Sequence, residues 1–228
     1  MRLAWQQIPS PIISELLCQN CLDGVVIDTE HGAYSTETLF SCIQIITLCN
    51  KKCFVRLTET NKTMIRVCLD AGVSGLIFST VESDTQSKEI KEICNYPSFG
   101  GSRGLGLVRE NLWGSKNLAT TKPILIAQIE TLKGVENVKE ISSNSFDYYM
   151  IGPYDLSASL GQPGIFDSKL FLDSLEKVKN QVSESKMAVH IPSRVKEELK
   201  KYKNYGIIAL GMDTTFLIEK YQEVEEYA

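Results

Sequence analysis

The sequence contains no run that approaches the roughly 18 consecutive apolar residues needed to cross a bilayer. Its N-terminal segment, Met1–Gln7, also lacks the apolar core of a secretory signal peptide. Basic residues are not in excess, because 24 Lys and Arg stand against 28 Asp and Glu and the net charge is −4. We therefore expect a cytoplasmic protein with no membrane and no nucleic-acid partner.

The chain also lacks low-complexity tracts, linkers and internal repeats, and 43% of its 228 residues are hydrophobic. We expect one domain, residues 1–228, with a sizeable core. The seven cysteines all lie in the first half, and an odd number does not fit a secreted disulfide scaffold. Cys18 and Cys21 have the spacing of a redox or zinc pair, but no second pair accompanies them, so we expect a structural role.

Strand-like apolar runs alternate with stretches of helical periodicity along the whole chain. The predicted strands are Leu3–Ile8, Gly24–Asp28, Cys53–Leu57, Gly75–Ser79, Pro123–Ile129, Phe146–Ile151, Met187–Ile191 and Gly206–Leu210. The predicted helices are Ser10–Cys21, Thr36–Cys49, Asn61–Ala71, Asp84–Cys94, Ser168–Glu184 and Ser193–Lys203. This alternation predicts an α/β fold, a (β/α)₈ TIM barrel of parallel strands, with an open doubly wound sheet as the alternative.

Polar side chains at the strand ends favour the barrel, because in a barrel all these ends meet at one mouth. They are Asp28, Glu30, His31, Arg56, Thr80, Glu82, Gln128, Glu130, Asp155, His190 and Asp213. The connection between Cys94 and Pro123 is too irregular for one helix and too long for an ordinary loop. We interpret it as a lid or a subunit contact.

Two of these strand ends carry carboxylates that can share a ligand. Glu130 and Asp155 follow consecutive predicted strands, so both reach the same rim. One or two carboxylates are what Mg²⁺ or Mn²⁺ takes from a protein, and such a cation polarises a carbonyl group. The alternative is that each carboxylate caps the next helix or pairs with a lysine.

A histidine and an arginine complete the candidate chemistry. His31 suits a general base because imidazole titrates near neutral pH, although a histidine at a strand end is also a common structural residue. That structural interpretation fits His190 better. Arg56 ends an apolar strand, where its guanidinium needs an anion such as a substrate carboxylate. The alternative partner is Glu30 or Glu59.

Seven motifs in one order resemble the hydroxy-oxo-heptanedioate aldolase family, the metal-dependent class II pyruvate aldolases. The match covers nearly the whole chain, from about Ile8 to Leu217. The motifs are Val25-Val-Ile-Asp-Thr-Glu-His, Phe54-Val-Arg, Leu69-Asp-Ala-Gly, Gly101-Ser-Arg-Gly-Leu-Gly, Gln128-Ile-Glu, Ile151-Gly-Pro-Tyr-Asp-Leu-Ser and Gly211-Met-Asp-Thr-Thr.

The resemblance implies roles for particular residues. The implied metal ligands are Glu130 and Asp155, for a divalent cation such as Mg²⁺, Mn²⁺ or Co²⁺. The implied catalytic residues are His31 as base, Arg56, and Asp70, which would pair with the histidine. The implied substrate-binding residues are Arg56, Gln128, Gly152, Pro153 and Asp155. It also implies a homo-oligomer, a trimer or a hexamer, with sites near subunit contacts.

The activity that this resemblance implies is reversible cleavage of a 4-hydroxy-2-oxo acid to pyruvate and an aldehyde through a metal-bound enolate. Small-molecule 2-oxo acids and aldehydes would be its substrates. Residues Leu57–Lys62 depart from the family pattern, which affects the aldehyde side. The alternatives are an oxaloacetate-type decarboxylase, an acyl-CoA lyase with the same enolate chemistry, and a protein that binds without catalysis.

Overall fold

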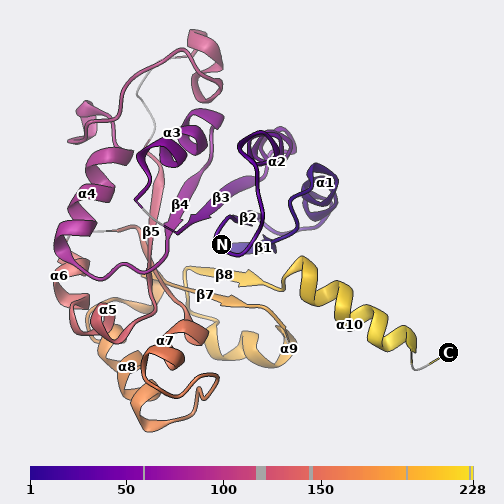
Figure 1. Ribbon diagram of the computed structural model, residues 1–228, viewed down its shortest axis with the longest axis vertical. Helices are drawn as coiled ribbons and strands as arrows, with labels where there is room; N and C mark the ends of the chain where they lie inside the picture. The colour runs from indigo at the N-terminus through magenta and orange to yellow at the C-terminus, as the bar shows by residue number, and fades with distance from the viewer. Residues whose placement is uncertain (59, 117–121, 144–145, 194, 226, 228) are drawn as a thin grey trace.

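The computed structural model describes residues 1–58, 60–116, 122–143, 146–193, 195–225 and 227. Its strands form a closed, wholly parallel barrel in the order β1 to β8, which confirms the predicted (β/α)₈ fold (Figure 1). The strands are β1 Arg2–Gln6, β2 Gly24–Asp28, β3 Lys52–Leu57, β4 Gly75–Phe78, β5 Ile124–Ile129, β6 Tyr148–Ile151, β7 Met187–Ile191 and β8 Ile207–Leu210. Closure comes from the pairing of β8 with β1, where Arg2 aligns with Ile208.

Each strand is buried on both faces, which explains the continuous apolar runs in the sequence. The inward-facing side chains fill the barrel with a core of its own, which includes Trp5, Phe54 and Met150. The outward-facing side chains form a second and larger core with the surrounding helices, as Val55 and Leu39 do. The two cores hold the strand ends in fixed positions.

Within the described ranges the chain forms ten α-helices, of which all but the last pack around the barrel. They are α1 Pro11–Cys18, α2 Thr36–Leu48, α3 Lys62–Ala71, α4 Asp84–Cys94, α5 Leu132–Glu136, α6 Val138–Ser143, α7 Pro153–Ser159, α8 Lys169–Lys179, α9 Val195–Glu198 and α10 Asp213–Glu225. Short 3₁₀ segments cover Pro97–Phe99, Arg109–Gly114, Glu184–Lys186 and Leu199–Tyr202. Several helices begin at a capping side chain: Ser35 accepts from the Thr38 N–H and Asn61 from those of Thr63 and Met64.

Three predicted helices are shorter than the periodicity indicated. The first ends at Cys18 rather than Cys21, because the Asn20 side chain donates to the Leu17 carbonyl and accepts from the Leu22 N–H. The stretch predicted as a helix to Glu184 ends at Lys179. The stretch predicted over residues 193–203 divides into α9 and a 3₁₀ turn.

The irregular connection after α4 packs against the outside of the barrel. Arg109 donates to the Ala71 carbonyl and to the Thr47 hydroxyl, and Arg103 pairs with Asp70. No residue of its described part, 95–116 and 122, lines the cavity at the carboxyl ends of the strands, so that part forms no lid over this cavity within one chain. Residues 117–121 of the predicted lid lie outside the described residues.

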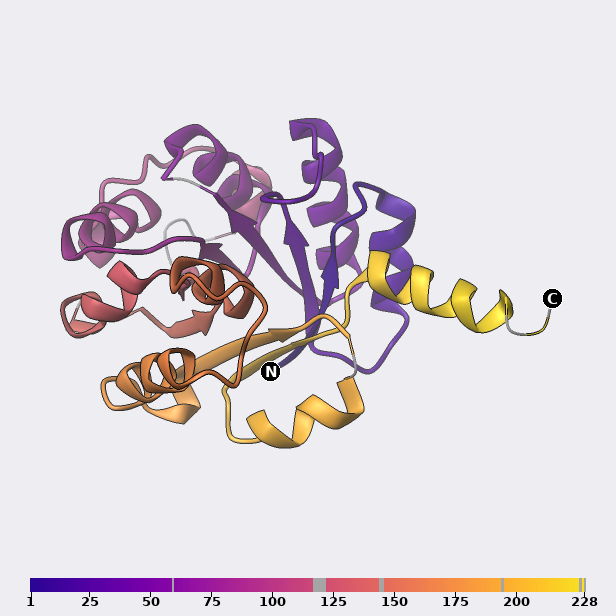
Figure 2. The same ribbon diagram turned by 60° about the horizontal axis from the view of Figure 1, so that its bottom comes forward.

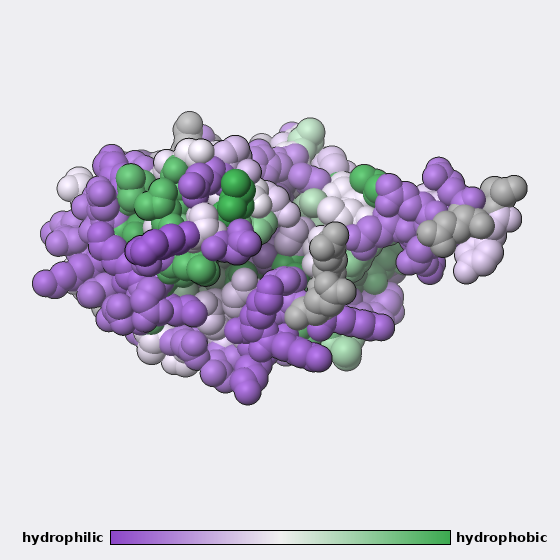
Figure 3. All heavy atoms as spheres, turned by 90° about the horizontal axis from the view of Figure 1, so that it is seen from below, coloured by the Kyte–Doolittle hydropathy of each residue, from purple (hydrophilic) through white to green (hydrophobic). Residues whose placement is uncertain are grey.

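The last helix, α10, projects away from the barrel and ends far from it (Figures 1 and 2). Its apolar side chains Phe216, Leu217, Ile218, Tyr221 and Val224 are all exposed. The face in Figure 3 is mostly hydrophilic, with apolar side chains in separate patches. Among the described helices, none has the length and apolar character that a membrane span requires.

Candidate active site

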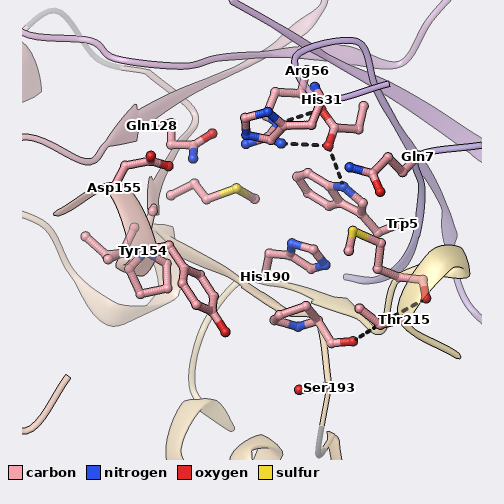
Figure 4. Close-up of a pocket in the computed structure, with 17 residues that line it drawn as sticks. Trp5, Gln7, His31, Arg56, Gln128, Tyr154, Asp155, His190, Ser193 and Thr215 are labelled. Atoms are coloured by element: carbon pink, nitrogen blue, oxygen red, sulfur yellow. Dashed lines mark hydrogen bonds and ion pairs between the residues drawn. The ribbon is translucent and has the colours of Figure 1, made fainter. Parts of the chain in front are cut away.

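A cavity of about 380 Å³ opens at the carboxyl ends of the strands (Figure 4). Strands β1, β2, β3, β5, β6 and β7 and the segments after β1, β2, β6, β7 and β8 supply its walls. Six of the predicted site residues line it: His31, Arg56, Gln128, Gly152, Pro153 and Asp155. The convergence of residues so far apart in the chain follows from the closed barrel.

Arg56 is held by two carboxylates. Its Nε and Nη2 donate to Asp28 over 2.9 and 2.6 Å, and its Nη1 lies 2.6 Å from a Glu30 oxygen. Of the predicted alternatives, the Glu30 ion pair is present, whereas Glu59 lies outside the described residues. Asp28 therefore engages two of the five guanidinium N–H donors, and the Glu30 oxygen adds its negative charge within ion-pair distance without a hydrogen bond.

Asp28 is the centre of this arrangement. Besides Arg56, its carboxylate accepts from the Trp5 indole at 3.2 Å and from the backbone N–H groups of Glu30 and His31. Burial by itself would raise the pKa of Asp28, but the hydrogen bonds and charge of Arg56 outweigh it and hold this pKa below its ordinary value. Asp28 is therefore ionised and fixes the arginine.

Glu130 lies directly behind the cavity wall and is 2% exposed. Its Oε1 accepts from the backbone N–H and the hydroxyl of Thr80, at 2.6 and 2.7 Å, and its Oε2 accepts from the Gln128 amide. Burial raises the pKa of Glu130 to about 7, and repulsion by Glu30 and Asp155 acts in the same direction. No basic side chain among the described residues forms a salt bridge with it.

These donors fit a hard divalent cation. Two carboxylates, Glu130 and Asp155, repel each other across the ends of β5 and β6, and the buried Oε1 of Gln128 has no hydrogen-bond partner. Within the described ranges, no three His, Cys, Asp or Glu side chains form a closed metal site. Two carboxylates beside an unpaired amide oxygen are oxygen donors of the kind that a hard divalent cation takes from a protein.

His31 stands at the mouth of the cavity with 57% of its side chain exposed, and its Nε2 lies 3.9 Å from Glu30. Asp70, predicted to pair with it, lies elsewhere in the chain, where its carboxylate accepts from Arg103 at 3.0 Å. No contact between Asp70 and His31 is present among the described residues of a single chain. Their pairing stays a prediction.

Two other strand-end carboxylates serve the structure instead. Glu82 forms an ion pair with Lys133 on the rim and does not line the cavity. Asp213 accepts from the backbone N–H groups of Gln7 and Ile8, both at 2.9 Å, and so ties the start of α10 to the end of β1. A carboxylate at a strand end is therefore not sufficient to identify a site residue.

A family comparison agrees with this geometry. The family described as HpcH/HpaI aldolase/citrate lyase matches residues 3–220. The chain belongs to this family. As a member of the HpcH/HpaI family it is a carbon–carbon lyase.

Several known proteins resemble this HpcH/HpaI family member over most of its length. The hydroxypyruvate/pyruvate aldolase of Pseudomonas aeruginosa is 26% identical, over 96% of this chain and 85% of that protein. The 4-hydroxy-2-oxo-heptane-1,7-dioate aldolase of Escherichia coli is 28% identical, over 93% of this chain and 84% of that protein. A family protein from Burkholderia cenocepacia J2315 shares the fold, with a TM-score of 0.91, 22% identity, and coverage of 100% of this chain and 93% of that one.

The HpcH/HpaI site of this chain includes residues that sequence reasoning missed as site residues. Trp5, Met150, Tyr154, Met212 and Thr215 also line the cavity. Trp5 falls inside the weakest predicted strand, and Met212 and Thr215 lie in the Gly211 motif, which was recognised without a role. Apolar and hydroxyl residues carry little signal by themselves, so only the closed barrel identifies them.

Proposed function

We propose that the protein reversibly cleaves a 4-hydroxy-2-oxo acid to pyruvate and an aldehyde and requires a divalent cation. The observation that carries this proposal is the position of Arg56. It is held by Asp28 and Glu30 and lines one cavity with His31, Gln128 and Asp155. The named relatives, among them aldolases of 4-hydroxy-2-oxo acids, support the same reaction.

Glu130 and Asp155 would hold the cation, and Mg²⁺, Mn²⁺ and Co²⁺ are the candidates. When bound there, the cation supplies Lewis-acid polarisation of the keto group of the substrate. Thr80 and Gln128 keep the Glu130 carboxylate in one orientation by hydrogen bonds, so the side chain is fixed before any ligand arrives.

The remaining chemistry belongs to Arg56 and His31. In the cleavage direction, His31 takes the proton from the C4 hydroxyl, directly or through a water. The C3–C4 bond then breaks, the aldehyde leaves, and the electron pair becomes the enolate of pyruvate. The guanidinium of Arg56, which lines the cavity, stabilises the negative charge that develops on the C2 oxygen. Protonation at C3 completes pyruvate, and the aldol direction runs through the same steps in reverse.

Within one chain, Asp70 is paired with Arg103 and does not line the cavity that contains His31. We therefore propose that the pairing forms between two copies in a homo-oligomer, a trimer or a hexamer. The exposed apolar side chains of α10 support such an assembly. All seven cysteines are free thiols, which supports a reducing, cytoplasmic location.

The test is pyruvate release from a racemic 4-hydroxy-2-oxo acid, followed with lactate dehydrogenase. We expect turnover that a chelator abolishes and Mg²⁺ or Mn²⁺ restores, and that Glu130→Ala removes. Glu82→Ala is the matched control, because Glu82 also follows a barrel strand but pairs with Lys133 outside the cavity. If no metal gives pyruvate from this substrate, the aldolase proposal is wrong. Release of CO₂ from oxaloacetate would then identify a decarboxylase, and cleavage of an acyl-CoA would identify an acyl-CoA lyase.

A further inference from the structure

His190, at the end of β7, forms part of the cavity wall in a fixed orientation. Its ring stacks on Trp5 with 4.0 Å between the ring centroids and 8° between the planes. Trp5 is held in turn by its hydrogen bond to Asp28, and the Arg56 guanidinium carbon lies 5.1 Å from the Trp5 ring centroid. The imidazole is thereby fixed relative to the guanidinium (Figure 4).

The hydrogen-bonding character of this imidazole follows from its surroundings. Its Nε2 lies 3.0 Å from the Gly211 carbonyl oxygen, which can only accept, so Nε2 carries the proton. Burial lowers the pKa of His190 to about 4, and the imidazole is therefore neutral at pH 7. Nδ1 is then an acceptor, and no donor to it is present among the described residues.

The position of His190 decides which part of a substrate it meets. Arg56, Gln128 and Asp155 lie on one side of the cavity, where the pyruvate part would bind. His190 lies below Trp5 in Figure 4, toward Ser193 and Thr215. A substrate anchored at Arg56 would extend its aldehyde-derived part toward this region.

We propose that Nδ1 of His190 accepts a hydrogen bond from a hydroxyl group on the aldehyde-derived part of the substrate, so that the enzyme favours hydroxyaldehydes over alkyl aldehydes. This inference rests on the proposed aldolase function. A neutral acceptor fits a hydroxyl group because a carboxylate has no proton to donate and an alkyl chain would leave Nδ1 without a partner.

The experiment measures kcat/KM for aldol addition of pyruvate to pairs of aldehydes that differ by one hydroxyl group: glycolaldehyde with acetaldehyde, and lactaldehyde with propanal. We expect the ratio within each pair to fall about tenfold in His190→Leu relative to the wild-type enzyme, because that variant cannot accept the bond. Each aldehyde is hydrated to the same degree in the assays of the wild type and of the variant. Comparing the ratio between the two proteins therefore removes the effect of hydration. His190→Asn, whose side-chain oxygen lies near the place of Nδ1, should recover part of the preference.

The outcomes separate this inference from the function on which it rests. Turnover of every aldehyde with ratios unchanged in His190→Leu would overturn the role of His190 and leave the aldolase intact. No turnover of any pair by the wild-type enzyme would overturn the proposed function and, with it, this inference. If His190→Leu does not fold, the same ratios in His190→Asn decide, because a ratio below that of the wild type is expected there as well.

Discussion

Gly152 lies against the carboxylate of Glu130: a Cβ atom at position 152 would be 2.5 Å from the Glu130 Oε2 and 2.7 Å from the Gln128 Nε2. The end of β6 therefore approaches the end of β5 more closely than any other residue type permits. This contact explains why a glycine precedes Pro153 and Asp155 in the motif. A larger residue at position 152 would therefore displace the Glu130 carboxylate.

Replacing this glycine should disrupt the carboxylate that we assign to the cation. We expect Gly152→Ala to lower kcat about 100-fold or more and to weaken Mn²⁺ binding, because Glu130 must move to avoid the added methyl group. Steady-state kinetics and a Mn²⁺ titration measure the two effects. Gly104→Ala is the control, since a Cβ there meets no atom within 4 Å. Equal kinetics in the two variants would refute the role assigned to Gly152.

The two carboxylates on Arg56 should differ in their effect on stability. Asp28 is 1% exposed and also accepts from Trp5, whereas the Glu30 side chain is 17% exposed. We expect Asp28→Asn to lower the free energy of unfolding by about 3 kcal/mol, because it breaks a buried ion pair, and Glu30→Gln by about 1 kcal/mol. Urea unfolding at pH 7.5 measures both. If Glu30→Gln costs as much as Asp28→Asn, Asp28 is not the centre of the arrangement.

The protonation of His190 should be visible in the pH dependence of stability. Burial lowers the pKa of His190 to about 4, with Arg56 acting in the same direction and Asp28 against it. The pKa of histidine in an unfolded chain is about 6.5. Between this pH and the lower pKa of His190 in the folded protein, only the unfolded chain takes up the proton. The contribution of neutral His190 to the free energy of unfolding is therefore fully present above about pH 6.5, and it decreases as the pH falls toward 4.

Urea unfolding of the wild type and of His190→Asn at pH 7.5 and pH 5.0 tests this prediction. Between these pH values we expect the wild type to lose about 2 kcal/mol more than the variant, because all other titrating groups are common to both. Parallel losses in the two proteins would mean that His190 is protonated in the folded state at pH 5.0. That result would also remove Nδ1 as an acceptor at this pH.

The sequence predicted the barrel well because its signals are local. Strand Gly24–Asp28 and helix Asp84–Cys94 have the predicted bounds, since continuous apolar runs and a serine cap define them without reference to the rest of the chain. The stack of Trp5 on His190 has no local signal. It joins β1 to β7 from opposite ends of the sequence and exists only because β8 closes the barrel between them.

For the candidate site, the sequence likewise predicted the residues at strand ends but not the hydrogen bonds between neighbouring strands. Residues at strand ends line the cavity because parallel strands of a barrel end together, as His31 and Asp155 show. The hydrogen bonds of Thr80 to Glu130 depend on the register of β4 against β5, which periodicity does not reveal. The predicted partner of His31 is the remaining discrepancy, because it lies outside the single-chain cavity.

That discrepancy leads to a test of shared sites. If Asp70 of one copy orients His31 of another, His31→Ala and Asp70→Ala should each be nearly inactive alone, because every site then lacks one member of the pair. Mixing the two variants under conditions that exchange subunits recreates complete sites. With random exchange of equal amounts, about one quarter of the sites regain both residues, whatever the size of the closed ring.

We therefore expect the mixture to recover about one quarter of the wild-type kcat per site, measured by pyruvate release after exchange. The control is a mixture of His31→Ala with Arg56→Ala, because both residues line the cavity of the same chain and no exchange can restore them together.

Arg103→Ala tests whether Asp70 matters only through its ion pair with Arg103. If it does, Arg103→Ala should lose as much activity as Asp70→Ala. Recovery in the Asp70 mixture and none in the Arg56 mixture requires a site built from two chains. A mixture as inactive as its components would overturn the pairing of Asp70 and His31 between two chains.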